Sequence, residues 1–148
     1  MKNKSKRIEP TIPASDNIRV GIYMLGYIWV ELWLAPKSND GSFDWNPSKE
    51  RDEQLAKSAP RIIVGCHDTP LWAAWGVLCH EVLEAALCDM RCRFRPTGVF
   101  QQCASDLYIF NFNHNQFTEV AARTGSYLCD CRKGFEREFN KLRKKGKK

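Results

Sequence analysis

The chain has 148 residues, of which 43% are hydrophobic, and a formal net charge of +6. This length and composition indicate one globular domain that is large enough to bury a core. No run of about 18 uncharged apolar residues is present, and no apolar segment follows the basic N-terminus, so neither a membrane span nor a secretory signal is predicted. We therefore expect a cytoplasmic protein without a membrane partner.

The positive charge is concentrated at the two ends of the chain. Residues 132–148 carry nine Lys or Arg and two Glu, a net of +7, whereas the chain between the two basic ends is slightly acidic. We divide the sequence into a basic arm over 1–17, a single domain over 18–140 and a basic tail over 141–148. The tail could contact nucleic acid weakly through phosphates, although solvated chain ends explain the same charges.

The seven cysteines cannot all be paired, because their number is odd. Without a secretory signal, reduced thiols are a better interpretation than a disulfide framework. Cys88 and Cys92 are spaced C-x3-C, and Cys129 and Cys131 are spaced C-x-C, which leaves a structural zinc site open as an alternative. Neither spacing is the C-x2-C of common zinc fingers, so we favour buried thiols.

Two strands are predicted near the start of the domain, over 18–24 and 27–34, with a turn at Leu25-Gly26. The second strand has one apolar face, formed by Ile28, Val30, Leu32 and Leu34. Its other face carries Tyr27, Trp29, Glu31 and Trp33. We expect another element to cover this aromatic face, with an apolar wall for a ligand as the alternative. Residues 36–60 are polar and contain the turn signal Asn39-Asp40-Gly41, so a long surface connection is predicted before a third strand over 61–65.

A helix is predicted over residues 70–88, with Thr69 as its N-cap and a proline in its first turn. The ionisable side chains within this apolar segment are His80, Glu81 and Glu84. His80 and Glu84 are four residues apart and share one helix face, whereas Glu81 projects about 100° away from His80. Buried carboxylates are costly unless they are paired, protonated or bound to a metal, so this pattern indicates a metal site. The alternative is a polar stripe that reaches solvent beside a structural histidine.

The segment His80-Glu81-Val82-Leu83-Glu84 resembles the zincin helix motif H-E-x-x-H, in which the outer residues bind zinc and the Glu acts on water. More closely, residues 18–130 are similar to the very short metallopeptidase-like proteins of phages and mobile elements, in which a strand leads into such a helix and a second His-containing helix follows. The resemblance implies a zinc-dependent peptidase with Glu81 as its general base. Glu84 replaces the second histidine, a change that zinc permits and that also suits manganese or iron.

A second helix is predicted to begin at His114. Asn113 is a suitable N-cap, Gln116 stands at the N3 position of a capping box, and Phe112 and Phe117 have the spacing of a hydrophobic staple. The segment before it, over 107–112, fits either a strand or a packed loop. The predicted apolar stripe of this helix comprises Phe117, Val120, Ala121, Thr124, Leu128, Cys131, Phe135, Phe139 and Leu142.

A zinc site needs a third protein ligand, and this second helix offers His114 and Glu119. With 100° per residue, His114 lies about 60° from the centre of the apolar stripe and Glu119 lies about 160° from it. We therefore predict that His80, Glu84 and His114 bind the metal and that Glu119 faces water. His67, in the loop before the first helix, is a further possible ligand or substrate contact.

The sequence thus predicts an α+β domain in which a small sheet of about three strands packs on the metal-binding helix, with a long C-terminal helix behind it. The predicted function is zinc-dependent hydrolysis of a peptide or protein substrate. Two alternatives remain open. One is a catalytically degenerate zincin-like binding or regulatory module, and the other is a nucleic-acid-associated protein with a basic tail.

Overall fold

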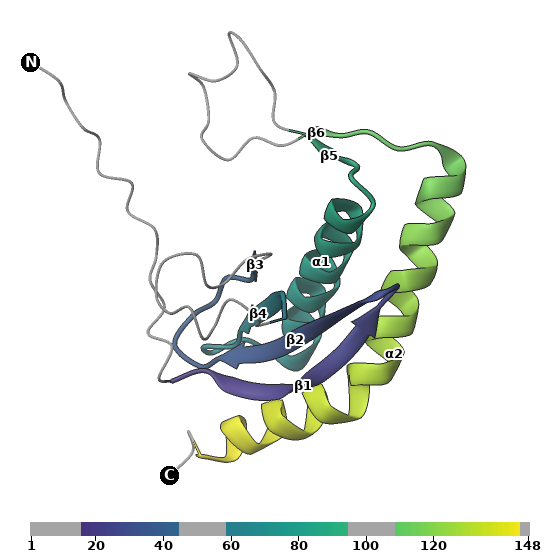
Figure 1. The fold of residues 1–148 in the computed structure, drawn as a ribbon. Coiled ribbons are helices and arrows are strands. Elements are labelled where there is room, and N and C mark those ends of the chain that lie inside the picture. The colour runs from purple at the N-terminus through teal and green to yellow at the C-terminus, as the bar shows by residue number, and fades with distance from the viewer. Residues whose placement is uncertain (1–15, 45–58, 95–108, 146–148) are drawn as a thin grey trace, which may run out of the picture.

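A computed structural model describes residues 16–44, 59–94 and 109–145 of the chain, which form an α+β fold (Figure 1). The elements are β1 (Ile18–Leu25), β2 (Ile28–Ala35), β3 (Ser42–Asp44), β4 (Arg61–Gly65), α1 (Leu71–Asp89), β5 (Arg93–Phe94), β6 (Ile109–Phe110) and α2 (His114–Lys145). The fold class and the long C-terminal helix agree with the sequence prediction.

The main sheet has four strands in the order β1-β2-β4-β3. β1 and β2 form an antiparallel hairpin, β4 runs parallel to β2, and β3 closes one edge antiparallel to β4. The prediction of about three strands was therefore low by one. β3 lies within the segment predicted as a surface connection, and its three residues are too few to display an alternating pattern.

The hairpin confirms the predicted alternation of β2. Val30, Leu32 and Leu34 are fully buried and face the helices. The turn lies one residue later than predicted, at Gly26-Tyr27, and Gly26 adopts a φ of 64°. A positive φ in this range suits glycine because it has no Cβ.

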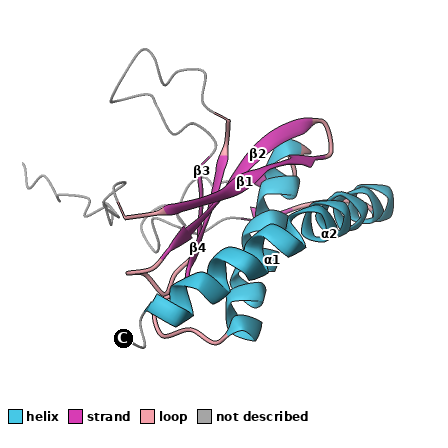
Figure 2. Ribbon diagram, turned by 90° about the horizontal axis from the view of Figure 1, so that it is seen from below, coloured by secondary structure: helices cyan, strands magenta, loops and turns pink. Residues whose placement is uncertain are grey.

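Both helices pack against the same face of the sheet (Figure 2). α1 lies against β4, whereas α2 crosses β1 and contacts α1. The rings of Trp75 in α1 and Phe135 in α2 are 4.7 Å apart. Tyr127, which was not in the predicted stripe of α2, is fully buried, and its hydroxyl donates to the carbonyl of Val30 at 3.4 Å.

The predicted N-terminal cap is confirmed for α2 but not for α1. At α2 the Asn113 N–H donates to Gln116 Oε1 at 2.9 Å and the Gln116 N–H donates to Asn113 Oδ1 at 3.0 Å, which confirms the capping box. The prediction that Thr69 caps α1 is wrong, because its hydroxyl donates to the carbonyl of His67. The helix begins at Leu71 after Pro70, without a side-chain cap.

The segment before α2, which the sequence left undecided, contains a short strand. β6 pairs antiparallel with β5 in a separate two-stranded sheet. In the described part of the chain, α1 is the one helix that is long and apolar enough to cross a membrane by length and composition, a test that the core helix of a globular domain also passes. Part of α1 is buried between β4 and α2.

Among the described residues, no element packs on the sheet face turned away from the helices, where we expected one. Trp29 has 54% of its surface exposed, and Ile22 and Met24 of the neighbouring strand have 41% and 42%. The sequence could not distinguish this outcome, because alternation shows which side chains share a face and not what packs on that face.

Two buried thiols make stability depend on pH in the alkaline range. Burial raises the pKa of Cys66 to about 11 and that of Cys131 to about 12, from 9.0. Because the pKa is higher in the folded protein, the stabilisation is fully present below about pH 9 and is lost as the pH rises through about 11 and 12. We expect the free energy of unfolding, measured in urea from about pH 8 to about pH 11, to fall by up to about 1.4 kcal/mol per pH unit for each thiol.

Two substitutions test the assignment of this pH dependence. Cys66→Ala should remove one of the two contributions and make the decline less steep, whereas Cys79→Ser, at an exposed cysteine, should leave it unchanged. A free energy of unfolding that stays constant above about pH 9 would contradict the expectation.

Candidate functional site

His80 and Glu84 form an open pair on one side of α1. His80 Nε2 lies 3.6 Å from Glu84 Oε2, and 72% of the His80 side chain is exposed to solvent. The pair arises from the spacing of four residues, which places the two side chains one helical turn apart on the same face. An imidazole nitrogen and a carboxylate oxygen that converge in this way are suitable donors for a divalent metal.

Glu81 occupies a different position, between α1 and the start of β3. It is buried, with 7% of its surface exposed. A Cβ atom added to Gly41, the residue before β3, would lie 2.5 Å from Glu81 Oε1 and 2.6 Å from Val77 Cγ1. The Glu81 side chain therefore fills the space that a larger residue at position 41 would need, and its carboxylate lies beside the edge of the sheet.

The element beside Glu81 is an edge strand. β3 pairs with β4 on one side only in the described part of the chain. β4 leads through a short loop into α1, as the sequence predicted, so the helix with the three ionisable side chains follows directly on the strand that pairs with β3.

The third predicted ligand lies elsewhere in the fold. His114 is the first residue of α2, is exposed, and lines a shallow hollow with Phe112, Asn113 and Phe117. Within residues 16–44, 59–94 and 109–145, no three His, Cys, Asp or Glu side chains are grouped so that they could hold a metal ion. The described residues thus bring His80 and Glu84 together without adding His114.

Glu119 is exposed on α2, as the sequence predicted, and forms an ion pair with Arg123 at 2.8 Å. Cys92, Cys129 and Cys131 are free thiols, and the cysteines proposed as an alternative zinc site form no three-residue metal group within the described residues. Cys92 and Cys131 are buried and Cys129 is exposed.

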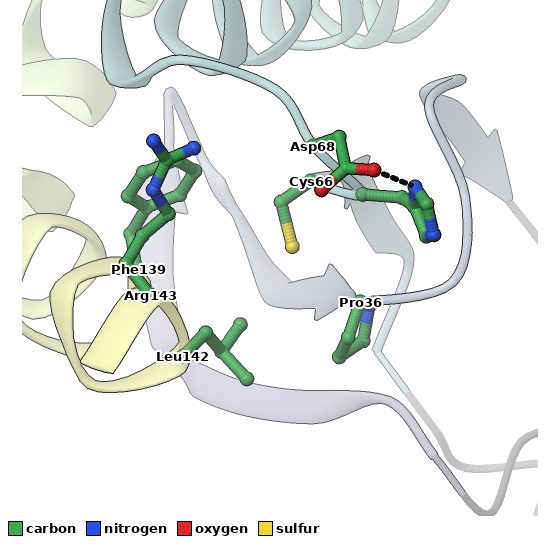
Figure 3. A pocket seen from close by; sticks show the side chains of 7 residues that line it. Pro36, Cys66, Asp68, Phe139, Leu142 and Arg143 are labelled. Carbon is green, nitrogen blue, oxygen red and sulfur yellow. Dashed lines mark ion pairs between the residues drawn. The ribbon is translucent and has the colours of Figure 1, made fainter. Parts of the chain in front are cut away.

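His67 lines a separate pocket of about 450 Å³ at the ends of β2 and β4 (Figure 3). Its Nδ1 lies 3.3 Å from Asp68 Oδ2. The other lining residues are Pro36, Cys66, Phe139, Leu142 and Arg143. These residues come from three distant parts of the sequence, so no local pattern signalled the pocket.

Comparisons with known proteins do not assign a function to these residues. No protein-family model, curated protein sequence or solved structure matches the chain.

Proposed function

We propose that this protein is a metal-dependent hydrolase, with zinc as the metal and a peptide or protein as the substrate. One observation carries the proposal. His80, Glu84 and the buried Glu81 lie on a single helix, with the Glu81 carboxylate against Gly41, the residue before β3. A candidate metal-binding pair and a candidate proton acceptor are thus combined on one helix.

The side chains of His80 and Glu84 are chemically suitable for zinc, because histidine nitrogen and carboxylate oxygen are both zinc ligands. His80 and Glu84 would hold the metal on the exposed side of α1, and His114, the third ligand predicted from the sequence, would have to approach this pair from the start of α2. When bound, zinc lowers the pKa of water toward neutrality and polarises a carbonyl group. Manganese and iron accept the same donors and are less favoured alternatives.

The residues of the chain have distinct roles in this proposal. Glu81 accepts a proton from the attacking water and delivers it to the leaving amine, which is the usual role of a general base in such sites. Its packing against Gly41 restrains the side chain, so the carboxylate need not be ordered during the reaction. An edge of the sheet orients the extended substrate by main-chain pairing.

Metal content is the direct test of this proposal. We expect stoichiometric zinc, measured by elemental analysis, in protein purified without a metal-affinity tag. His80→Ala should lose the metal because a ligand is removed, and His114→Ala should also lose it, whereas Glu119→Ala should retain it. Loss of the metal should lower the melting temperature, since a ligand that binds only the folded state stabilises that state.

The outcomes separate the proposals from one another. Zinc that stays bound in His80→Ala would overturn the hydrolase site, whereas zinc that stays bound in His114→Ala alone would overturn only the third ligand. Stoichiometric zinc without peptide hydrolysis would favour the catalytically degenerate binding module. A metal-free protein would exclude the zinc site and leave the nucleic-acid-associated alternative.

A further inference from the structure

The open face of the sheet is apolar next to the hairpin turn. Met24 of β1 pairs with Trp29 of β2, and Ile22 pairs with Glu31, so these exposed side chains are neighbours on the face opposite to the buried Val30 and Leu32. Ile22, Met24 and Trp29 are each about half exposed. Exposed apolar side chains that adjoin one another in this way commonly mark a binding surface.

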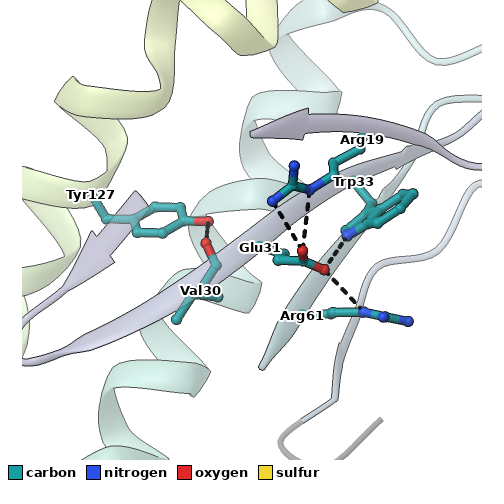
Figure 4. Close-up of polar contacts among 6 residues, drawn as sticks. All are labelled: Arg19, Val30, Glu31, Trp33, Arg61 and Tyr127. Carbon is teal, nitrogen blue, oxygen red and sulfur yellow. Dashed lines mark hydrogen bonds and ion pairs between the residues drawn. The ribbon is translucent and has the colours of Figure 1, made fainter. Parts of the chain in front are cut away.

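Beside these residues, a cluster of charged side chains spans β1, β2 and β4 (Figure 4). Arg19 Nε donates to Glu31 Oε1 at 3.1 Å, and Arg61 Nε donates to Glu31 Oε2 at 3.2 Å. Trp33 Nε1 donates to Oε2 as well, at 3.0 Å. Two guanidinium groups therefore surround one carboxylate, which leaves these three side chains with one positive charge, and Asp44 of β3 lies beside Arg61.

Planar groups lie along this face. The Arg61 guanidinium lies 5.6 Å from the centre of the Trp33 ring. Trp29 and Trp33 are four residues apart on the same side of β2, which places them about 13 Å apart along the strand. Two indole rings thus flank the cationic cluster.

We propose that this face, formed by Ile22, Met24, Trp29, Trp33, Arg19, Glu31 and Arg61, binds single-stranded nucleic acid. Bases stack on Trp29 and Trp33, and phosphates contact Arg19 and Arg61. Unpaired bases expose the flat surfaces that aromatic and guanidinium groups stack on, whereas a paired duplex keeps those surfaces stacked inside. The site ends at β3, where the acidic Asp44 lies beside Arg61.

The charged cluster favours nucleic acid over a protein partner. It lies in the middle of the face and has Glu31 at its centre, and glutamate is a residue type that protein interfaces are depleted of. A protein would have to satisfy the N–H groups of two arginines in a desolvated contact, which phosphate oxygens do directly. This inference does not depend on the hydrolase proposal.

The test uses fluorescein-labelled oligothymidine of about 15 nucleotides, a length that covers the usual site size. Binding to the full-length protein is followed by anisotropy at fixed low salt. We expect Trp29→Ala to weaken the affinity about tenfold or more, because one stacking platform is lost. Trp72→Ala is the matched control, since Trp72 is 78% exposed but lies on α1, and it should bind like the parent.

Three further variants test the phosphate contact, the aromatic ring and the independence from the hydrolase site. Arg61→Gln should reduce the slope of affinity against salt concentration by about one, because one phosphate contact disappears. Trp29→Phe keeps an aromatic ring and should retain most of the affinity. This variant distinguishes the loss of stacking in Trp29→Ala from misfolding of that variant. His80→Ala should bind oligothymidine like the parent, which separates this surface from the hydrolase site.

Two results would overturn the inference. If Trp29→Ala and Trp72→Ala both bind like the parent, any affinity belongs to the basic chain ends. If sedimentation shows that the parent is a dimer and Trp29→Ala a monomer, the face is an interface between two copies of the chain.

Discussion

The Glu81→Gln protein is expected to bind metal like the parent and to hydrolyse peptide at least about 10²-fold more slowly. Glutamine has nearly the same shape as glutamate but cannot accept a proton from water. Because Glu81 is buried against Gly41, a substitution of similar volume should preserve the packing there. Turnover of a fluorogenic peptide, with metal content measured on the same preparation, tests the expectation.

Glu84→Gln is the matched control, one helical turn above His80 on the same helix. It should lower metal affinity, because an anionic ligand becomes neutral, whereas Glu81→Gln should not. Full activity in Glu81→Gln with metal still bound would exclude the proposed mechanism. If the parent and Glu81→Gln both lack metal and Glu81→Gln is the more stable, then Glu81 is a structural carboxylate whose burial is costly.

The largest effect on stability is expected for Phe135→Ala, with a loss of about 3–5 kcal/mol in the free energy of unfolding. Phe135 is fully buried on α2 and contacts Trp75 of α1 and Phe139. Its removal leaves a cavity where the two helices meet, and the surrounding backbone can close that cavity only in part. Denaturation in urea, analysed as a two-state transition, measures the change.

Phe117→Ala provides the comparison on the same helix. Phe117 is 51% exposed and stacks on Phe112 with ring centres 5.7 Å apart. Its loss removes one local contact at the helix start and should cost less than about 1 kcal/mol. Equal losses for the two variants would mean that α2 does not pack on α1 through Phe135.

Features formed by neighbouring residues were accessible from the sequence. The capping box of Asn113 and Gln116, the staple of Phe112 and Phe117, and the spacing of His80 and Glu84 all involve side chains within five positions of one another. Local backbone geometry brings such residues together whatever the rest of the chain does. The alternation of β2 was predictable for the same reason.

Features that depend on partners far along the chain needed the tertiary structure. Tyr127 is buried because its hydroxyl reaches Val30, 97 positions away, and β3 is a strand because its three residues pair with β4. Within the described part of the chain the expected cover of the Trp29 face is missing, because both helices pack on the other side of the sheet.

The candidate site also combines features that the sequence predicted with features that only the tertiary structure decided. The sequence by itself determined that His80, Glu81 and Glu84 share one helix, because periodicity fixes directions around a helix axis. Only the tertiary structure decided that Glu81 is buried beside Gly41, that His80 is exposed and that His114 stands apart from them at the start of α2. Periodicity carries no information about the distance between two helices, which is set by the side chains that pack between them.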